Sequence, residues 1–464
     1  MTAQMPNPRT TRGRLRIAAA ATAILLPVAA NAETLNQMLG SAYLFSPTLK
    51  SARYTLDAVN EQRPQALSGW LPTVTVTGTA YPNRTTQPSL LGPGSRYNQL
   101  TGTTLLTLPI TQGGGEYARL HGAEHNILAT RASLLSTEQT VLYAAVTAYV
   151  DVLTDRAIVK AETENLNALR QMLATVTQQV QAGERTIPEE TLTRLRVSDA
   201  EATLIDGRSQ VVQAESRYFQ AAGVAPAGLA DPVPLAMLPP TLADTRRLVL
   251  AGNPTVQASI YTALSARDSV DQAISTLLPT LSFVVSDERY RQNWPSDTKY
   301  LNGSYSNTYF GLQLSVPIYQ GGSEYAAVRI AKKTALARDK DRDASSLDAV
   351  SSAEQAWEAR SDATGQVHQY QDTLRIAAQL VEQYRQEVAA GEITVFEALD
   401  GYSSRLTAEV SLFSASRNRT LADYAVLLSV GGLTARTLAL DVPYYDPAGD
   451  YKRTKWRIWG LGVE

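Results

Sequence analysis

One short pattern in the sequence could hold a catalytic metal ion. Residues 121–125 read His-Gly-Ala-Glu-His, which matches the H-x-x-E-H arrangement of one class of zinc proteases. On a helix, His121 and His125 would lie one turn apart and could share a metal. The chain has three His and no Cys, however, so it offers few further ligands or nucleophiles. We therefore expect a solvated helix face here, with adventitious metal binding as the weaker alternative, and no enzyme activity.

A run of glycines could bind phosphate. Gly113, Gly114 and Gly115 are not followed by the Gly-Lys-Ser/Thr that completes a nucleotide-binding loop. The run comes directly after a segment with strand character, so it predicts a strand-to-helix turn, and no cofactor is implied. The same junction returns in the second half of the chain, at Gly321 and Gly322.

These junctions belong to a repeat that spans most of the chain. A shift of 207 to 208 residues places Pro47 on Pro254 and Pro109 on Pro317. It also places Arg329 and Lys333 where the first copy has its two His, which weakens the metal-site interpretation further. The expected divisions are a signal peptide (1–32), a first repeat (33–222), a Pro-rich linker (223–243), a second repeat (244–440) and an aromatic, basic tail (441–464) that packs on the surface.

Composition and the N-terminus indicate an exported protein. The 42 basic and 44 acidic side chains are nearly balanced, so nothing predicts a nucleic-acid partner. Four arginines precede an apolar stretch that ends at Ala30-Asn31-Ala32, the pattern of a cleavable secretory signal. We expect the mature chain to begin at Glu33.

Four segments predict β-strands. They cover about 71–81, 97–109, 278–290 and 305–317, and they alternate apolar and polar residues; for example, Phe310, Leu312 and Leu314 share one face. Their lengths suit membrane strands. Four strands cannot close a barrel, so this interpretation requires an oligomer, whereas solvated hairpins remain the alternative. Tyrosines near the strand ends predict an aromatic girdle at the lipid interface: Tyr81, Tyr97, Tyr290, Tyr305 and Tyr309.

In each copy, the segment that follows the strand pair predicts a helical hairpin. Long helices are expected over about 113–182 and 321–390, and returning helices over 188–222 and 395–432. Gly183 and Gly391 mark the hairpin tips as left-handed caps. In the first long helix the apolar spacing is 3-4-3-4, as in a coiled coil, at Leu166, Leu169, Leu173, Val176 and Val180.

With these features the chain resembles the TolC family of outer-membrane export channels, from about residue 33 to 440. The residues that carry the resemblance are 314–322 (Leu-Ser-Val-Pro-Ile-Tyr-Gln-Gly-Gly), Asn253-Pro254 and Leu278-Pro279. The resemblance implies an α+β membrane protein. Its homotrimer would form a twelve-stranded outer-membrane β-barrel, continuous with a long periplasmic α-helical barrel, in a Gram-negative bacterium. It also implies outer-membrane lipid, a periplasmic adaptor and an inner-membrane pump of the RND or ABC type as partners.

The resemblance also assigns roles at the hairpin tips. Acidic residues at the matching positions line a periplasmic aperture, which points to Glu397, Asp400 and Glu189; the alternative is that they only complement helix dipoles. The family closes its tip with an Arg and a Tyr, but Ile393 and Val388 occupy those positions here. The candidate replacements that could pair with the acids are Arg185, Arg194 and Arg405.

A structural role is the competing function. A trimeric coiled-coil surface protein or adhesin would also use long helices without conducting anything. Such proteins usually keep their membrane strands at one end, whereas these strands recur inside both repeats. We therefore expect an exit duct of a tripartite export system. The sequence does not choose among drug, metal and secreted-protein cargo.

Overall fold

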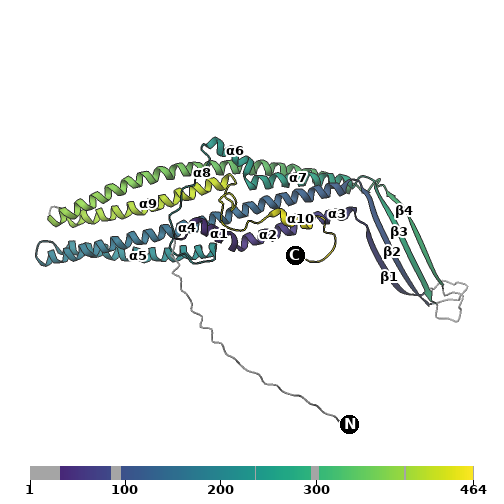
Figure 1. The fold of residues 1–464 in the computed structure, drawn as a ribbon, viewed down its shortest axis with the longest axis horizontal. Helices are drawn as coiled ribbons and strands as arrows, with labels where there is room; N and C mark the ends of the chain where they lie inside the picture. The colour runs from purple at the N-terminus through teal and green to yellow at the C-terminus, as the bar shows by residue number, and fades with distance from the viewer. Residues whose placement is uncertain (1–31, 85–95, 236, 294–302, 391–392, 463–464) are drawn as a thin grey trace, which may run out of the picture.

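The computed structural model describes residues 32–84, 96–235, 237–293, 303–390 and 393–462. Nearly all of the expected signal peptide and Gly391 lie outside these residues. A four-stranded sheet occupies one end of an elongated molecule, and two long helical hairpins point away from it (Figure 1). Among the described residues, no helix combines the length and the apolar composition needed to cross a membrane.

Both repeats contribute to one antiparallel sheet in the order β1-β2-β3-β4. The first copy supplies β1 (Thr73–Arg84) and β2 (Arg96–Gln112), and the second supplies β3 (Thr280–Asn293) and β4 (Gly303–Ser315). Strands β1 and β3 begin two residues later than expected, because each follows a proline that cannot donate to a sheet ladder. For the same reason β4 ends at Ser315, before Pro317.

Each repeat also forms a helical hairpin. The hairpins consist of α4 (Gly115–Gln181) with α5 (Ile187–Ala222), and α8 (Ser323–Ala390) with α9 (Val395–Ser429). The long helices α4 and α8 have 67 and 68 residues, so each runs about 100 Å at 1.5 Å per residue. Both begin two residues later than expected, after the glycine pair at the junction, and α9 ends three residues earlier, at Ser429.

Shorter helices cover the part of the long helices nearer the sheet. These are α1 (Leu35–Phe45), α2 (Pro47–Asn60) and α3 (Gln62–Leu67) in the first copy, and α6 (Leu242–Gly252) and α7 (Pro254–Ser275) in the second. The main core lies where α1, α2, α4, α5 and α9 meet, and Tyr149 and Tyr218 are its largest fully buried side chains. A second apolar cluster lies nearer the hairpin tips.

The C-terminal tail packs on the N-terminal helices through α10 (Pro447–Thr454) (Figure 1). The guanidinium of Arg63 on α3 lies over the ring of Trp456, 4.6 Å from its centroid. The same side chain donates to the backbone carbonyl of Lys455. Asn60 donates to a carboxylate oxygen of Asp450 over 3.0 Å. Polar contacts therefore hold the tail against the helices that precede β1.

Candidate functional site: the sheet faces and the hairpin tips

The register gives the sheet one apolar face. Val74 of β1 lies opposite Leu106 of β2, which lies opposite Val285 of β3 and then Phe310 of β4. Side chains two residues apart along a strand share a face, so Leu312 and Leu314 also lie on this side. Large apolar side chains here are exposed in the single chain. The expected alternation of β4 is therefore present, and it extends across all four strands.

Hydroxyl groups dominate the opposite face. On β1 this face carries Thr73, Thr75, Thr77 and Thr79, which alternate with the residues of the apolar face. Their partners on β2 belong to the same, more polar face. The register also corrects the expected aromatic girdle. The five tyrosines all fall on this hydroxyl-rich face, away from the apolar face, and Tyr309 lies in the middle of β4 instead of near its end. Tyr290 stacks on Tyr305 with ring centroids 4.9 Å apart. Proximity to a strand end does not decide the face; the odd or even position along the strand does.

Both sheet-to-helix junctions turn at a pair of glycines with positive φ. Gly113 and Gly114 have φ values of 66° and 81°, and Gly321 and Gly322 have 72° and 82°. Only glycine adopts this region readily, so the pairs turn the chain sharply from strand into helix. In each copy a buried glutamate in the first turn of the helix accepts a backbone N–H from the strand-to-helix turn: Glu116 from Gln112, and Glu324 from Gln320. The sequence repeat contained these two acids, but their capping role was not predicted.

In both repeats, a Thr at the hairpin tip donates to the Glu three residues later. Gly183 has φ of 81°, as expected for a left-handed cap. The backbone N–H and the hydroxyl of Thr394 both donate to Oε2 of Glu397, each over 2.9 Å. Thr186 donates to Glu189 in the same way, over 2.9 and 3.0 Å. Glu397 and Asp400 are exposed, whereas Glu189 is half-buried.

Of the three candidate arginines, Arg185 joins the two hairpins. Its guanidinium donates to Oε1 of Glu189 over 3.1 Å and to the backbone carbonyls of Ile393 and Val388 over 3.3 and 3.4 Å. The side chain is only 12% exposed. Next to it, Val395 of α9 packs into an apolar cluster with residues of α4 and α5, including Val176 and Val197.

The other two arginines do not connect the hairpins. Arg194 donates to Glu190, four residues earlier on its own helix, over 2.7 Å. Among the described residues, Arg405 has no carboxylate within 4 Å. Ile393 and Val388 lack the Arg and Tyr side chains that the resemblance implied. Their backbone carbonyls nevertheless form part of the contact, which side-chain identity alone did not predict.

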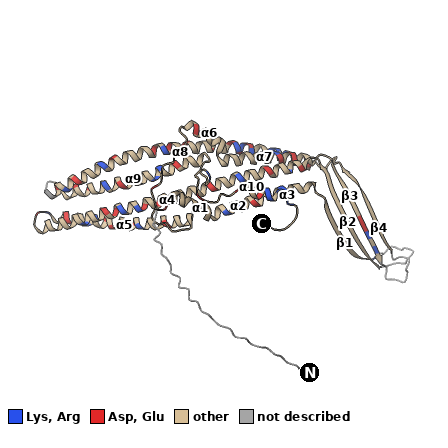
Figure 2. Cartoon of the chain, in the orientation of Figure 1, with Lys and Arg blue, Asp and Glu red and all other residues tan. Residues whose placement is uncertain are grey.

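Hydrogen bonding also sets the charge state of the tip acids. The backbone N–H of Thr394, and then its hydroxyl, lower the pKa of Glu397 below the usual value of a glutamate. The backbone N–H of Thr186 lowers the pKa of Glu189 in the same way, with Arg185 adding to the effect. Both carboxylates therefore stay ionised near neutral pH. Figure 2 shows the acids and bases distributed along the helices, while the strands are nearly uncharged except toward their loop end.

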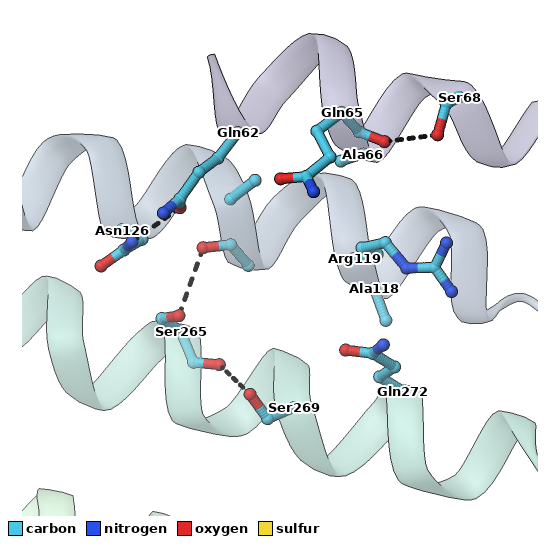
Figure 3. Close-up of a pocket in the computed structure, with 12 residues that line it drawn as sticks. Gln62, Gln65, Ala66, Ser68, Ala118, Arg119, Asn126, Ser265, Ser269 and Gln272 are labelled. Atoms are coloured by element: carbon cyan, nitrogen blue, oxygen red, sulfur yellow. Dashed lines mark hydrogen bonds between the residues drawn. The ribbon is translucent and has the colours of Figure 1, made fainter. Parts of the chain in front are cut away.

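The histidine pattern on α4 forms ion-pair contacts with neighbouring helices of both repeats. Nδ1 of His125 lies 2.6 Å from a carboxylate oxygen of Asp268 on α7, and Glu124 pairs with Arg63 on α3 over 3.1 Å. A nearby cavity of about 570 Å³ between α3, α4 and α7 is lined by amides and hydroxyls such as Gln62, Ser265 and Ser269 (Figure 3). Among the described residues no group of three His, Cys, Asp or Glu is placed to hold a metal.

Comparison with known proteins identifies the architecture. The model of the outer membrane efflux protein family matches residues 38–224 and 246–432, once in each repeat. The outer membrane efflux protein BepC of Brucella suis is 27% identical over 448 residues, which are 94% of either chain. The alkaline protease secretion protein AprF of Pseudomonas aeruginosa is 25% identical over 299 residues, 63% of this chain and 60% of the relative.

Solved structures share the fold. The CmeC outer membrane channel of Campylobacter jejuni superposes with a TM-score of 0.77 at 16% identity, over 91% of this chain and 89% of that one. CusC superposes with a TM-score of 0.75 at 14% identity, over 86% and 92%. The family model covers both repeats, with their strand pairs and hairpins, and the chain belongs to the outer membrane efflux protein family.

Proposed function

We propose that three copies of this chain form a continuous exit duct. As a member of its family, the chain is an outer-membrane efflux channel with a large periplasmic portion. The observation that carries the finer proposal is the two-faced sheet joined directly to helices of about 100 Å. With the apolar face against lipid and the hydroxyl-rich face inward, the sheet would continue the wall of a water-filled helical tube.

Unpaired strand edges support the trimer. In a single chain, β1 and β4 each keep one edge without a strand partner among the described residues. Lipid cannot hydrogen-bond these edges, so membrane strands must close into a ring. Four strands are too few for a ring, whereas three copies give twelve, within the range that forms membrane barrels.

The hairpin tips would form the periplasmic aperture. Glu397 and Asp400 are exposed and three residues apart, so they lie near one another on α9. In a trimer they would give two adjacent rings of carboxylates, which favour cations and bind multivalent ones. We assign Glu189 a different part, because it is paired with Arg185 and supports the contact between hairpins.

The energy for export would come from partners that dock at these tips. We propose a periplasmic adaptor and an inner-membrane pump of the RND or ABC type, acting on a passive duct. Of the relatives, BepC is named for efflux and AprF for protease secretion, so both small molecules and secreted proteins are proposed as cargo.

Single-channel recording in a planar bilayer tests the duct. The purified protein should give small, cation-selective currents that trivalent cations block. The block should be lost in Glu397→Ala/Asp400→Ala and kept in the control Glu354→Ala, an acid that pairs with Arg246 on α6. Folded trimers that carry no current would favour the non-conducting structural protein instead.

A further inference from the structure

A hollow of about 600 Å³ lies on the sheet toward the loop end of the strands. Its floor includes Gly78 and Gly102, and Arg289, Arg291, Ser304 and Ser306 stand around it. A Cβ added at either glycine would meet nothing within 4 Å, so the space above the backbone is open. The hollow therefore combines two cations, two hydroxyls and an accessible stretch of main chain.

The register places these six residues on the apolar face. Gly78 lies opposite Gly102, which lies opposite Arg289 and then Ser306, in one row across the four strands. The next row toward the loops contains Leu100, Arg291 and Ser304. Val285 lies on the same face as Arg289, four residues earlier on β3. One row separates the polar hollow from Val285, and it contains Thr104, Asp287 and Thr308.

Both arginines have donors to spare. Arg289 is 79% exposed and uses only Nε for its 3.2 Å contact with Asp287. The carboxylate of Asp287 also accepts a hydrogen bond from Thr308 over 2.7 Å. Among the described residues, Arg291 has no carboxylate within 4 Å. The three ionised groups leave one net positive charge, and the terminal nitrogens of Arg289 and all those of Arg291 remain available to an anion.

The height of the hollow matches the edge of a lipid layer. From Leu281, at the helix end of the apolar face, to Arg289 is eight residues, about 27 Å along the strand at about 3.4 Å per residue. A tilt of about 40° reduces this to about 21 Å, close to the apolar band of about 25 Å around membrane barrels. Acyl chains would therefore lie on the Val, Leu and Phe side chains, pass the single row that contains Asp287 and Thr308, and end in headgroups at the two arginines.

We propose that this hollow binds the phosphate-bearing headgroup of an outer-membrane lipid. Arginine forms paired, charge-assisted hydrogen bonds with phosphate oxygens, and basic pockets at a membrane interface suit phosphorylated headgroups. The serine hydroxyls and the open glycine floor let the headgroup approach the backbone. A neighbouring copy would join at the edges of β1 and β4, so it would leave this face to lipid. The inference rests on the proposed function in one respect, the placement of the sheet in the membrane.

Native mass spectrometry of the detergent-solubilised full chain tests the site. Phosphatidic acid should bind the protein about tenfold more tightly than diacylglycerol with the same acyl chains, because only the phosphate can pair with the arginines. The preference should disappear in Arg289→Gln/Arg291→Gln. It should persist in the matched control Arg247→Gln/Arg375→Gln, which removes two exposed helical arginines. Gly102→Val should also weaken binding, because it fills the floor while it keeps both arginines.

Three results would overturn the proposal. The first is an unchanged preference in the double arginine variant. The second is a wild-type protein with no preference for phosphatidic acid. The third is displacement of the lipid by an equal concentration of inorganic phosphate, which would indicate a simple anion site. Channel recordings on the same variants separate this inference from the duct, because a conducting protein without the lipid preference would contradict only the inference.

Discussion

At the residue scale, Arg185 is the side chain most directly suited to hold the tip closed. Replacing it with Ala removes the bonds to Ile393 and Val388 and leaves Glu189 without its cation. A loss of about 2 kcal/mol would shift a closed-to-open equilibrium about thirtyfold toward the open state. Arg185→Ala should therefore raise the open fraction in bilayer recordings.

Arg194→Ala is the matched control for this prediction. Its ion pair lies within one helix and the side chain is exposed, so the conductance should stay near that of the wild type. Arg185→Lys should give an intermediate result, because one ammonium group cannot reproduce the fork of donors. Equal conductance in all three variants would argue against a latch at this residue.

Glu397 leads to a prediction about pH. Its lowered pKa means that the carboxylate keeps its charge at about pH 4.3, where an ordinary glutamate is half protonated, and loses it only below. In an Asp400→Asn background, cation block should therefore persist through that pH and fail at a lower one. Thr394→Ala removes one donor and should move the midpoint upward. A midpoint above the ordinary glutamate range would contradict this assignment.

At the element scale, the second hairpin depends on a close approach between its helices. A Cβ at Gly401 of α9 would lie 2.9 Å from the ring of Tyr384 on α8, whereas a Cβ at Gly365 would meet nothing within 4 Å. Overpacking costs about 1–3 kcal/mol, and removing a helical glycine gains about 0.5–1 kcal/mol.

Gly401→Ala should thus lower the free energy of unfolding by about 1 kcal/mol, and Gly365→Ala should raise it by about as much. Denaturant midpoints of the detergent-solubilised protein, followed by circular dichroism, would show the opposite signs. Stabilisation by both substitutions would mean that α8 and α9 separate easily at Gly401.

The elements themselves could be predicted because their signals are local. Alternation identified the strands, glycine pairs marked the junctions, and a single glycine marked each hairpin tip. The faces of the tyrosines could not be read from their nearness to strand ends, because a shift of one residue reverses the side. The sequence anticipated a carboxylate partner for Arg185, which is Glu189, but it could not predict the other partners. They are backbone carbonyls from the other repeat, 208 residues away in the case of Ile393.

At the scale of the whole molecule, the duplication explains how one chain makes both a sheet and a helical wall. Each copy supplies two strands and one hairpin, and β2 pairs with β3 across the copies. Asp151 of α4 holds Arg217 of α5 and Arg417 of α9, so the hairpins are joined near the core as well as at the tip. The two copies together would therefore make one third of the proposed ring.

Closure of that ring predicts a specific cross-link. Within one chain β1 and β4 occupy opposite edges of the sheet, so a disulfide between them must join two copies. The chain has no Cys, which leaves introduced thiols as the only ones. The test combines Thr75→Cys in turn with Asn307→Cys, Tyr309→Cys or Gln313→Cys. All four residues lie on the hydroxyl-rich face, so the three pairs test different registers between β1 of one copy and β4 of the next. For at least one pair, oxidation in membranes should give bands that end at the covalent trimer.

Thr77→Cys/Thr103→Cys is the control, because these residues lie directly opposite each other in one chain and should yield only monomers. A ladder that continues beyond three copies would indicate an open filament instead of a closed ring, since a head-to-tail contact stops growing only when its rotation closes. Absence of cross-links at every register, with the control pair oxidised, would place the strand edges against something other than a second copy. Cross-linked products that stop at the trimer would instead mean that the backbone groups at each strand edge hydrogen-bond to a strand of another copy, as strands in lipid require.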